Sequence, residues 1–227
     1  DEIVVANIDR LLRESWRDNG VVPAPQADDH EWIRRVYVTL AGSIPSTSEV
    51  DRFDNDESAD RRSRLLSELI ADPRCASHLA GTWVNLLIGR SNPRNVDQDQ
   101  LYAWLRDGFE QNRSWIDTVG QLISAEGRSD KNGATNFLLA HLNDQATPAT
   151  AVTARLFFGT QVHCMQCHDH PFAKAVRQTE FWELNAFFKQ TQRTPVKASL
   201  GSLAMSSKAQ VWELSDRPLG GMTFFET

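Results

Sequence analysis

The sequence predicts a mainly α-helical domain with a loose or β-hairpin C-terminal tail, and three observations support this fold class. Apolar residues recur at the 3.6-residue spacing of a helix almost continuously as far as Gln190. Residues that start and stop helices stand at the ends of these periodic segments. After Gln192 serine, lysine and glycine dominate, and a short alternating segment follows. We therefore expect a helical domain over 1–192 and an extension over 193–227 that packs on the same domain.

The first predicted helices are amphipathic segments with recognisable ends. The first ends at Asn19-Gly20, and one of its faces comprises Ile8, Leu11, Leu12, Ser15 and Trp16. Asp28-Asp29 supplies the N-cap of the second helix and Gly42 ends it. The face of this second helix comprises Trp32, Val36, Tyr37 and Leu40. Ser46 to Glu49 forms a capping box, which predicts a third, short helix.

Periodicity and turn residues place the remaining elements. Helices are predicted over 58–71, 74–88, 98–112, 115–125, 135–142 and 179–190. Thr147 followed by Pro148 is typical of a helix start, and this helix should continue to about residue 163. Alternation over 210–214 predicts a short strand, and residues 223–225 are its expected partner.

Composition and charge exclude some classes of function. The chain is 41% hydrophobic and 24% charged, as in an ordinary globular protein, with a net charge of −6. It shows no basic face for nucleic acid, since Arg34-Arg35 and Arg61-Arg62 fall at solvated positions of predicted helices. No apolar run is long enough to span a bilayer. The acidic clusters at 51–57 and 97–99 lack the spacing of a calcium loop and are interpreted as loops and helix caps.

The most informative motif is Cys-Met-Gln-Cys-His at residues 164–168. Cys-x-x-Cys-His is the attachment signature of c-type haem. Thiols at this spacing can add to the two vinyl groups on one edge of a porphyrin, and the adjacent imidazole can offer Nε2 to the iron. We therefore expect Cys164 and Cys167 to hold one covalent haem c with His168 as the proximal iron ligand. Cys75, by contrast, lies in an apolar helical segment and is expected to be a packed thiol.

Two other interpretations of the same residues stay open. Cys164, Cys167, His168 and His170 together offer four ligands for a structural zinc ion, although four ligands within seven residues strain a tetrahedron. Cys164 and Cys167 could instead form a structural or redox-active disulfide, but the sequence lacks a thioredoxin-like βαβ context.

The residues around the motif resemble a cytochrome-like domain of unknown function that is abundant in planctomycetes and related bacteria. The likeness rests on Phe157-Phe158-Gly159, on residues 164–172 with the order CMQCHDHPF, and on the aromatic helix FWELNAFF at 181–188. Weaker similarity extends over about 3–190. The resemblance implies a haem c domain of large exported proteins, usually followed by a second uncharacterised domain. Asp1 and the ordered-looking end at 222–227 also suggest a piece of a longer protein. Because haem is joined to thiols outside the cytoplasmic membrane, the haem interpretation implies an exported, periplasmic or equivalent location.

A haem at this motif would need aromatic walls and a group that holds the imidazole of the iron ligand. The expected wall residues are Phe158, Phe172 and Phe187, with further aromatic area from Phe157, Trp182 and Phe188. Asp169, next to the iron ligand, could accept the imidazole Nδ1–H or orient the ring, and a solvated carboxylate is the alternative. His170 and His163 lie too close to His168 to reach across the ring. His170 is expected to bond a propionate or a backbone carbonyl, or to be structural.

The distal iron ligand decides the function. Candidates are Met205 above all, then Met222, His141 and His78. A methionine ligand would favour electron transfer, whereas an open position would allow peroxide chemistry. The sequence favours an electron-transfer module that serves a redox partner protein or an adjacent domain of the longer chain. A peroxidase-like haem enzyme is the alternative, and a structural zinc module is the third possibility.

Overall fold

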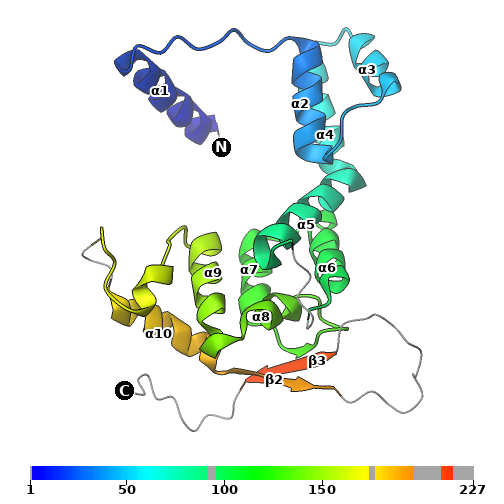
Figure 1. The fold of residues 1–227 in the computed structure, drawn as a ribbon. Coiled ribbons are helices and arrows are strands. Elements are labelled where there is room, and N and C mark those ends of the chain that lie inside the picture. The colour runs from blue at the N-terminus through cyan, green and yellow to red at the C-terminus, as the bar shows by residue number, and fades with distance from the viewer. Residues whose placement is uncertain (1, 91–95, 174–176, 197–210, 217–227) are drawn as a thin grey trace, which may run out of the picture.

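The computed structural model describes residues 2–90, 96–173, 177–196 and 211–216, and within them the fold is mainly helical, as predicted (Figure 1). The first seven helices are α1 (Glu2–Asp18), α2 (Asp29–Ala41), α3 (Thr47–Asp54), α4 (Arg61–Ala71), α5 (Pro73–Ile88), α6 (Gln98–Glu110) and α7 (Trp115–Ile123). The later helices are α8 (Thr135–His141), η1 (Asp144–Ala146), α9 (Thr147–Phe157), η2 (His163–Gln166) and α10 (Gln178–Lys189), where η denotes a 3₁₀ helix. No helix in these ranges is both long and apolar enough to cross a bilayer.

A small antiparallel sheet closes the lower end of the molecule in Figure 1. Its strands are β1 (Gly127–Arg128), β2 (Thr191–Pro195) and β3 (Trp212–Asp216), in the order β1-β3-β2. The predicted strand at 210–214 is thus present as β3, but it pairs with β1 and β2. Its expected partner, 223–225, lies outside the described residues. β2 also crosses the boundary that we predicted between 192 and 193.

The main core lies among α5 to α10 and the sheet. Its fully buried side chains include Leu87, Leu101, Leu122, Phe137 and Leu138. Leu214 of β3 is 1% exposed and belongs to the same cluster, so the strand from the C-terminal extension packs on the helical domain. Asp97 caps α6 by accepting the Gln100 N–H at 3.1 Å, as expected for that acidic cluster.

A second, smaller core lies between α2, α3 and α4, which Figure 1 shows as a separate group at the top of α5. The predicted ends are confirmed here. Asp28 accepts the Glu31 N–H at 2.8 Å, Gly42 has φ 68° and Ser46 forms the capping box with Glu49. The buried side chains are Ile33, Tyr37, Ala41, Phe53, Leu65 and Leu69.

Arg61 and Arg62 are partly exposed, but they also make contacts between helices that the sequence did not predict. Both guanidinium groups bond Asp29, at the start of α2, and Arg62 Nε donates to Asp29 Oδ1 at 3.0 Å. Arg61 and Arg62 also lie over the rings of Phe53 and Trp32, at 4.8 and 4.9 Å from their centroids. The pair therefore fastens α4 to α2. Helical periodicity could not reveal this, because the partner carboxylate lies on another helix.

The predicted face of the first helix does not enter a core. α1 forms as expected, but no residue of it is buried, and it stands apart from the other helices in Figure 1. The exposed apolar side chains are Ile3, Val4, Val5, Ile8, Leu11, Leu12 and Trp16. Arg10 bonds Glu14 one turn further on at 2.9 Å, and such exposed pairs add only a few tenths of a kcal/mol to helix stability (about 0.3–0.5).

Candidate functional site

The Cys-x-x-Cys-His motif lies in a loop between α9 and α10. We predicted that the α9 helix would run on to residue 163, but it ends at Phe157. Gly159 has φ 66°, the left-handed conformation that ends helices, and the N–H groups of Phe158 and Thr160 both donate to the Ala154 carbonyl at 3.1 Å. The chain then turns into η2, which carries Cys164, while Cys167 follows directly after it.

Met165, between the two cysteines, anchors this loop. Its side chain is 0% exposed and packs with Ala154, Val162 and Phe181 in a cluster of their own. The Met165 N–H also donates to the Val162 carbonyl at 2.9 Å. Cys164 and Cys167, on either side, are exposed free thiols. The buried methionine therefore fixes the loop while both sulfur atoms stay accessible to a reagent or ligand.

His168 is exposed, and its hydrogen bond assigns the tautomer of the neutral ring. Nδ1 lies 2.7 Å from the backbone carbonyl oxygen of Asp169. A carbonyl only accepts hydrogen bonds, so Nδ1 carries the ring proton of the neutral imidazole. Nε2 is then unprotonated and has a lone pair to offer. This is the tautomer that a histidine needs to bind a metal through Nε2, with Nδ1–H held by an outer partner.

Of the roles that the sequence left open for Asp169, the structure contradicts one, acceptance of the imidazole proton by the carboxylate. The carboxylate is exposed beside the start of α10, as in the solvated alternative. It does not accept the imidazole proton, since that proton goes to the carbonyl of the same residue. Instead Asp169 Oδ1 accepts the N–H of Gln178, the first residue of α10, at 2.8 Å. The Gln178 side chain returns a hydrogen bond, because its Nε2 donates to the Gln166 carbonyl at 3.0 Å. The motif loop is thus tied to the start of α10 by two hydrogen bonds.

His170 has its Nδ1 lone pair engaged. The N–H groups of Phe172 and Ala173 donate to it at 3.2 and 2.9 Å, which leaves the ring proton on Nε2 of a neutral imidazole. Of the roles expected from the sequence, these two backbone donors fit that of a structural histidine, and Nε2–H stays available to an acceptor. In this state His170 has no free lone pair for zinc. Among the described residues no group of three or more His, Cys, Asp and Glu side chains is arranged to hold a metal ion.

The three predicted wall residues are all exposed aromatic side chains. Phe158 at the end of α9 is 62% exposed, Phe172 is 91% exposed and Phe187 on α10 is 68% exposed. Phe172 lies edge-on to His170, with ring centroids 6.3 Å apart. Phe188, by contrast, belongs to the main core, and Trp182 packs against the Met165 cluster. Phe158 and Phe172 stand before and after the motif in the chain and leave exposed apolar surface, whereas Phe187 lies near the C-terminal end of α10.

The predicted distal ligands are not brought to the motif by the described residues. Met205 and Met222 lie outside them. His141 Nε2 bonds the Leu87 carbonyl at 2.7 Å, and burial lowers the pKa of this imidazole. His78 packs against Gly42, where a Cβ would lie 2.3 Å from its Nδ1. Both histidines therefore have structural surroundings, His141 between α5 and α8 and His78 between α5 and the end of α2.

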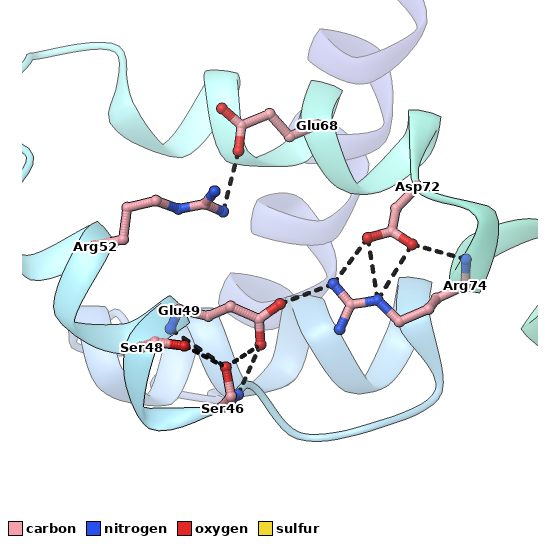
Figure 2. Close-up of polar contacts among 7 residues, drawn as sticks. All are labelled: Ser46, Ser48, Glu49, Arg52, Glu68, Asp72 and Arg74. Atoms are coloured by element: carbon pink, nitrogen blue, oxygen red, sulfur yellow. Dashed lines mark hydrogen bonds and ion pairs between the residues drawn. The ribbon is translucent and has the colours of Figure 1, made fainter.

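A second polar cluster lies in the small lobe, the part of the chain formed by α2, α3, α4 and the start of α5. Figure 2 shows its side chains pointing toward one another. Arg74 at the start of α5 donates to Asp72 through Nε and Nη2, at 3.0 and 2.8 Å, and to Glu49 at 2.8 Å. Arg52 pairs with Glu68 at 3.3 Å. The side chains border a pocket of about 300 Å³. The sequence indicated only the capping-box part of this cluster, because Arg74 is far from Glu49 along the chain.

Electrostatics in this cluster favour the charged forms. Burial acts to raise the pKa of the Glu49 carboxyl, but hydrogen bonds from the Ser46 N–H, from Arg74 and from the Ser46 hydroxyl outweigh it and bring that pKa to about 2. The hydrogen bond from Arg74 lowers the pKa of Asp72, and Asp72 and Glu49 together raise that of Arg74. These shifts are those of a satisfied ion-pair network, and they leave no group poised for proton transfer near neutral pH.

Comparisons with known proteins give one result. No curated protein and no solved structure matches the chain. One family model matches residues 7–193, which include α2 to α10, the motif loop and the first part of β2. The match covers most of the chain. The chain therefore belongs to the PSCyt2 family, described as a protein of unknown function (DUF1549).

Proposed function

We propose that this domain is a c-type cytochrome module. One haem c is held covalently by Cys164 and Cys167, with His168 as an axial ligand of the iron. The observation that carries the proposal is the state of His168. Its Nδ1 is held by the Asp169 carbonyl at 2.7 Å, so an exposed Nε2 with a free lone pair stands directly after two exposed thiols.

The thiols fit the attachment chemistry. Each thiol adds across one vinyl double bond, so that sulfur bonds one vinyl carbon, the thiol hydrogen ends on the other and the π bond is lost. The addition consumes no oxidant, but it needs both sulfurs reduced and accessible. Cys164 and Cys167 meet this requirement because Met165 between them, and not either cysteine, occupies the buried position.

The surroundings also fit a flat apolar group. Bound haem would supply one-electron redox chemistry at the iron. The chain contributes the exposed rings of Phe158, Phe172 and Phe187 as apolar cover for the porphyrin. His170 presents Nε2–H, a donor suited to a propionate, because backbone N–H groups occupy its Nδ1. The distal ligand is proposed to come from Met205.

Electron transfer is favoured over peroxidase-like catalysis by the other histidines. Peroxide chemistry needs an acid–base group aimed at the iron-bound reactant. The Nε2–H of His141 donates to the Leu87 carbonyl on α5. His163 Nδ1 lies 3.3 Å from the side-chain Nε2 of Gln166. A redox partner protein or an adjacent domain of the longer chain would exchange the electron. Because haem is joined to thiols outside the cytoplasmic membrane, the proposal places the domain in the periplasm or an equivalent compartment.

Covalent attachment is tested by mass. The domain would be produced with export and a haem c maturation system, extracted with acidified acetone and weighed intact. We expect the mass of the polypeptide plus one haem, and its loss in Cys164→Ala/Cys167→Ala. Cys75→Ala is the matched control, because this third thiol is buried and should leave attachment unchanged. A wild-type mass equal to the bare polypeptide would refute the proposal.

The electron-transfer role is tested on the loaded protein. Reversible one-electron voltammetry without peroxidase turnover is expected, and Met205→Ala should alter the spectrum of the iron and its potential. Peroxidase turnover should also be measured in His141→Ala. Robust turnover in the wild type that such a substitution abolishes would assign the site to an enzyme instead.

A further inference from the structure

The hydrogen bonds of Asp169 connect the imidazole of His168 with the start of α10. The carbonyl of Asp169 receives the His168 Nδ1–H at 2.7 Å, and its carboxylate receives the Gln178 N–H at 2.8 Å. One residue thus contacts the imidazole with its main chain and the first turn of α10 with its side chain. A carboxylate at this position satisfies an N–H that no helical carbonyl can reach, and it lies at the positive end of the helix dipole.

α10 itself is held firmly by the cores. Phe181 packs with Met165, Asn185 is fully buried and donates to Thr150 Oγ1 at 3.0 Å and to the Gln145 carbonyl at 3.1 Å, and Phe188 belongs to the main core. The motif loop, in contrast, is exposed at Cys164, Cys167, His168 and Asp169. The orientation of the exposed imidazole is therefore set by a helix that the cores fix in place, through the carboxylate of Asp169.

We propose that Asp169 is a positioning residue for His168: its carboxylate, capping α10, holds the carbonyl that keeps Nδ1 protonated and Nε2 free for the iron. This inference rests on the proposed function for the identity of the ligand that Nε2 binds. It differs from a carboxylate that takes the imidazole proton directly, because here the carboxylate contacts the first residue of α10 and only the backbone carbonyl contacts the ring. A helix and a loop together select the tautomer.

The first experiment needs no haem. Long-range ¹H–¹⁵N correlation spectra of the reduced, haem-free domain report which ring nitrogen of His168 carries the proton. Wild type should show Nδ1–H, and Asp169→Asn should match it, because an amide oxygen can still accept the Gln178 N–H. Asp169→Ala should give a mixture of both tautomers. An Asp169→Ala protein with the wild-type tautomer would overturn the inference.

A pair of substitutions at Gln178 tests the same bond from the donor side. Gln178→Pro removes the backbone N–H at the first position of a helix, where proline is well tolerated. The residue before it is already extended, with Arg177 at φ −102° and ψ 155°, as proline requires. Gln178→Ala is the control, since it removes only the side-chain bond to Gln166. We expect Gln178→Pro to behave like Asp169→Ala and Gln178→Ala like wild type; identical spectra for both would contradict the inference.

The loaded protein supplies a second measurement. Asp169→Ala keeps the backbone carbonyl but frees it to move away from Nδ1. Loss of such an outer partner weakens a histidine–metal bond by about tenfold, so this variant should lose its axial imidazole that much more readily on acidification. Its midpoint potential should rise because the ring donates less. Asp169→Asn should restore wild-type behaviour. Unchanged ligand release and potential in Asp169→Ala would overturn the axial role. A wild type without covalent haem would refute the proposed function, and the tautomer spectra would still decide whether Asp169 orients His168.

Discussion

The small lobe and the motif loop both concentrate polar groups, but they use them in different ways. Between α3 and α5, Arg74 binds Asp72 and Glu49, and Arg52 binds Glu68 (Figure 2). In the loop between α9 and α10, the hydrogen bonds go to backbone groups and hold the loop in place. The two thiols and Nε2 of His168 are left accessible there.

This difference separates a structural cluster from a candidate site. Charged groups that satisfy one another have depressed or raised pKa values but nothing left to bind a ligand, as the pKa of about 2 at Glu49 illustrates. A site needs atoms with free lone pairs on a support that does not move. In the loop the support is Met165, buried between the two exposed cysteines. We therefore expect a large loss of stability when Met165 is replaced and almost none when Cys164 or Cys167 is replaced.

The largest expected effect on stability is at Met165. Met165→Ala should lower the free energy of unfolding by about 3 kcal/mol, because it removes a fully buried side chain and leaves a cavity beside Phe181 and Ala154. Urea unfolding followed by circular dichroism measures it. Met165→Leu keeps the volume and is the control, with an expected cost of less than about 1.5 kcal/mol. A loss of under about 1 kcal/mol in Met165→Ala would mean that the loop is not anchored by this residue.

Glu49 should make the stability of the protein depend on pH in the acid range. The pKa of Glu49 is about 2 in the folded protein and near 4.5 when the group is unperturbed, so the unfolded chain binds the proton more readily between these values. The stabilisation is therefore fully present above about pH 4.5 and is lost as the pH falls toward 2. After allowance for the partial exposure of Glu49 it should amount to about 2 kcal/mol.

Urea unfolding at several pH values across the acid range tests this effect. Glu49→Gln cannot ionise, so its stability should fall less steeply with acid than that of the wild type over the same interval. Parallel pH profiles for the two proteins would show that Glu49 does not contribute through its charge.

A smaller effect is expected when Arg74 is replaced. Arg74→Met should lower the free energy of unfolding by about 1 kcal/mol, because two carboxylates lose their shared cation while the side chain, 43% exposed, is partly screened by water. Arg10→Met on α1 is the matched control, since within the described part of the chain Arg10 pairs with Glu14 of its own helix. The control should change stability by less than about 0.5 kcal/mol. Equal effects at both positions would contradict a network that joins α3 to α5.

The sequence predicts those features of the fold that depend on neighbouring residues. The caps at Asp28 and Ser46 act over three residues, and both lie where the pattern places them. The helix predicted over 148–163 is too long because apolar periodicity continues to Phe158, although Gly159 is a visible stop signal. The partners of β3 could not be predicted, since the Trp212 carbonyl receives its hydrogen bond from Ser129, far away in the chain.

The candidate site is predictable in its residue types and not in its hydrogen bonds. The spacing of Cys164, Cys167 and His168 is enough to indicate haem attachment as the favoured chemistry. The contact that selects the His168 tautomer is made by a backbone carbonyl, which every residue carries and no pattern marks. Asp169 stands out in the sequence for its carboxylate, but that carboxylate caps α10. Periodicity also predicts a core-facing side for α1, although this helix has no buried residue.

The smallest expected effect on stability lies at the two cysteines that matter most for the proposed function. In the haem-free protein, Cys164→Ser and Cys167→Ser should each change the free energy of unfolding by less than about 0.5 kcal/mol, because both side chains are exposed. Cys75→Ser is the matched control. That thiol is 5% exposed and burial raises its pKa, so a hydroxyl placed there loses its hydrogen bonds to water, at a cost of about 1–3 kcal/mol. Cys164→Ser or Cys167→Ser could instead destabilise the protein as much as Cys75→Ser. The thiols would then be part of the packing, and the contrast between buried Met165 and two exposed, free cysteines would be wrong.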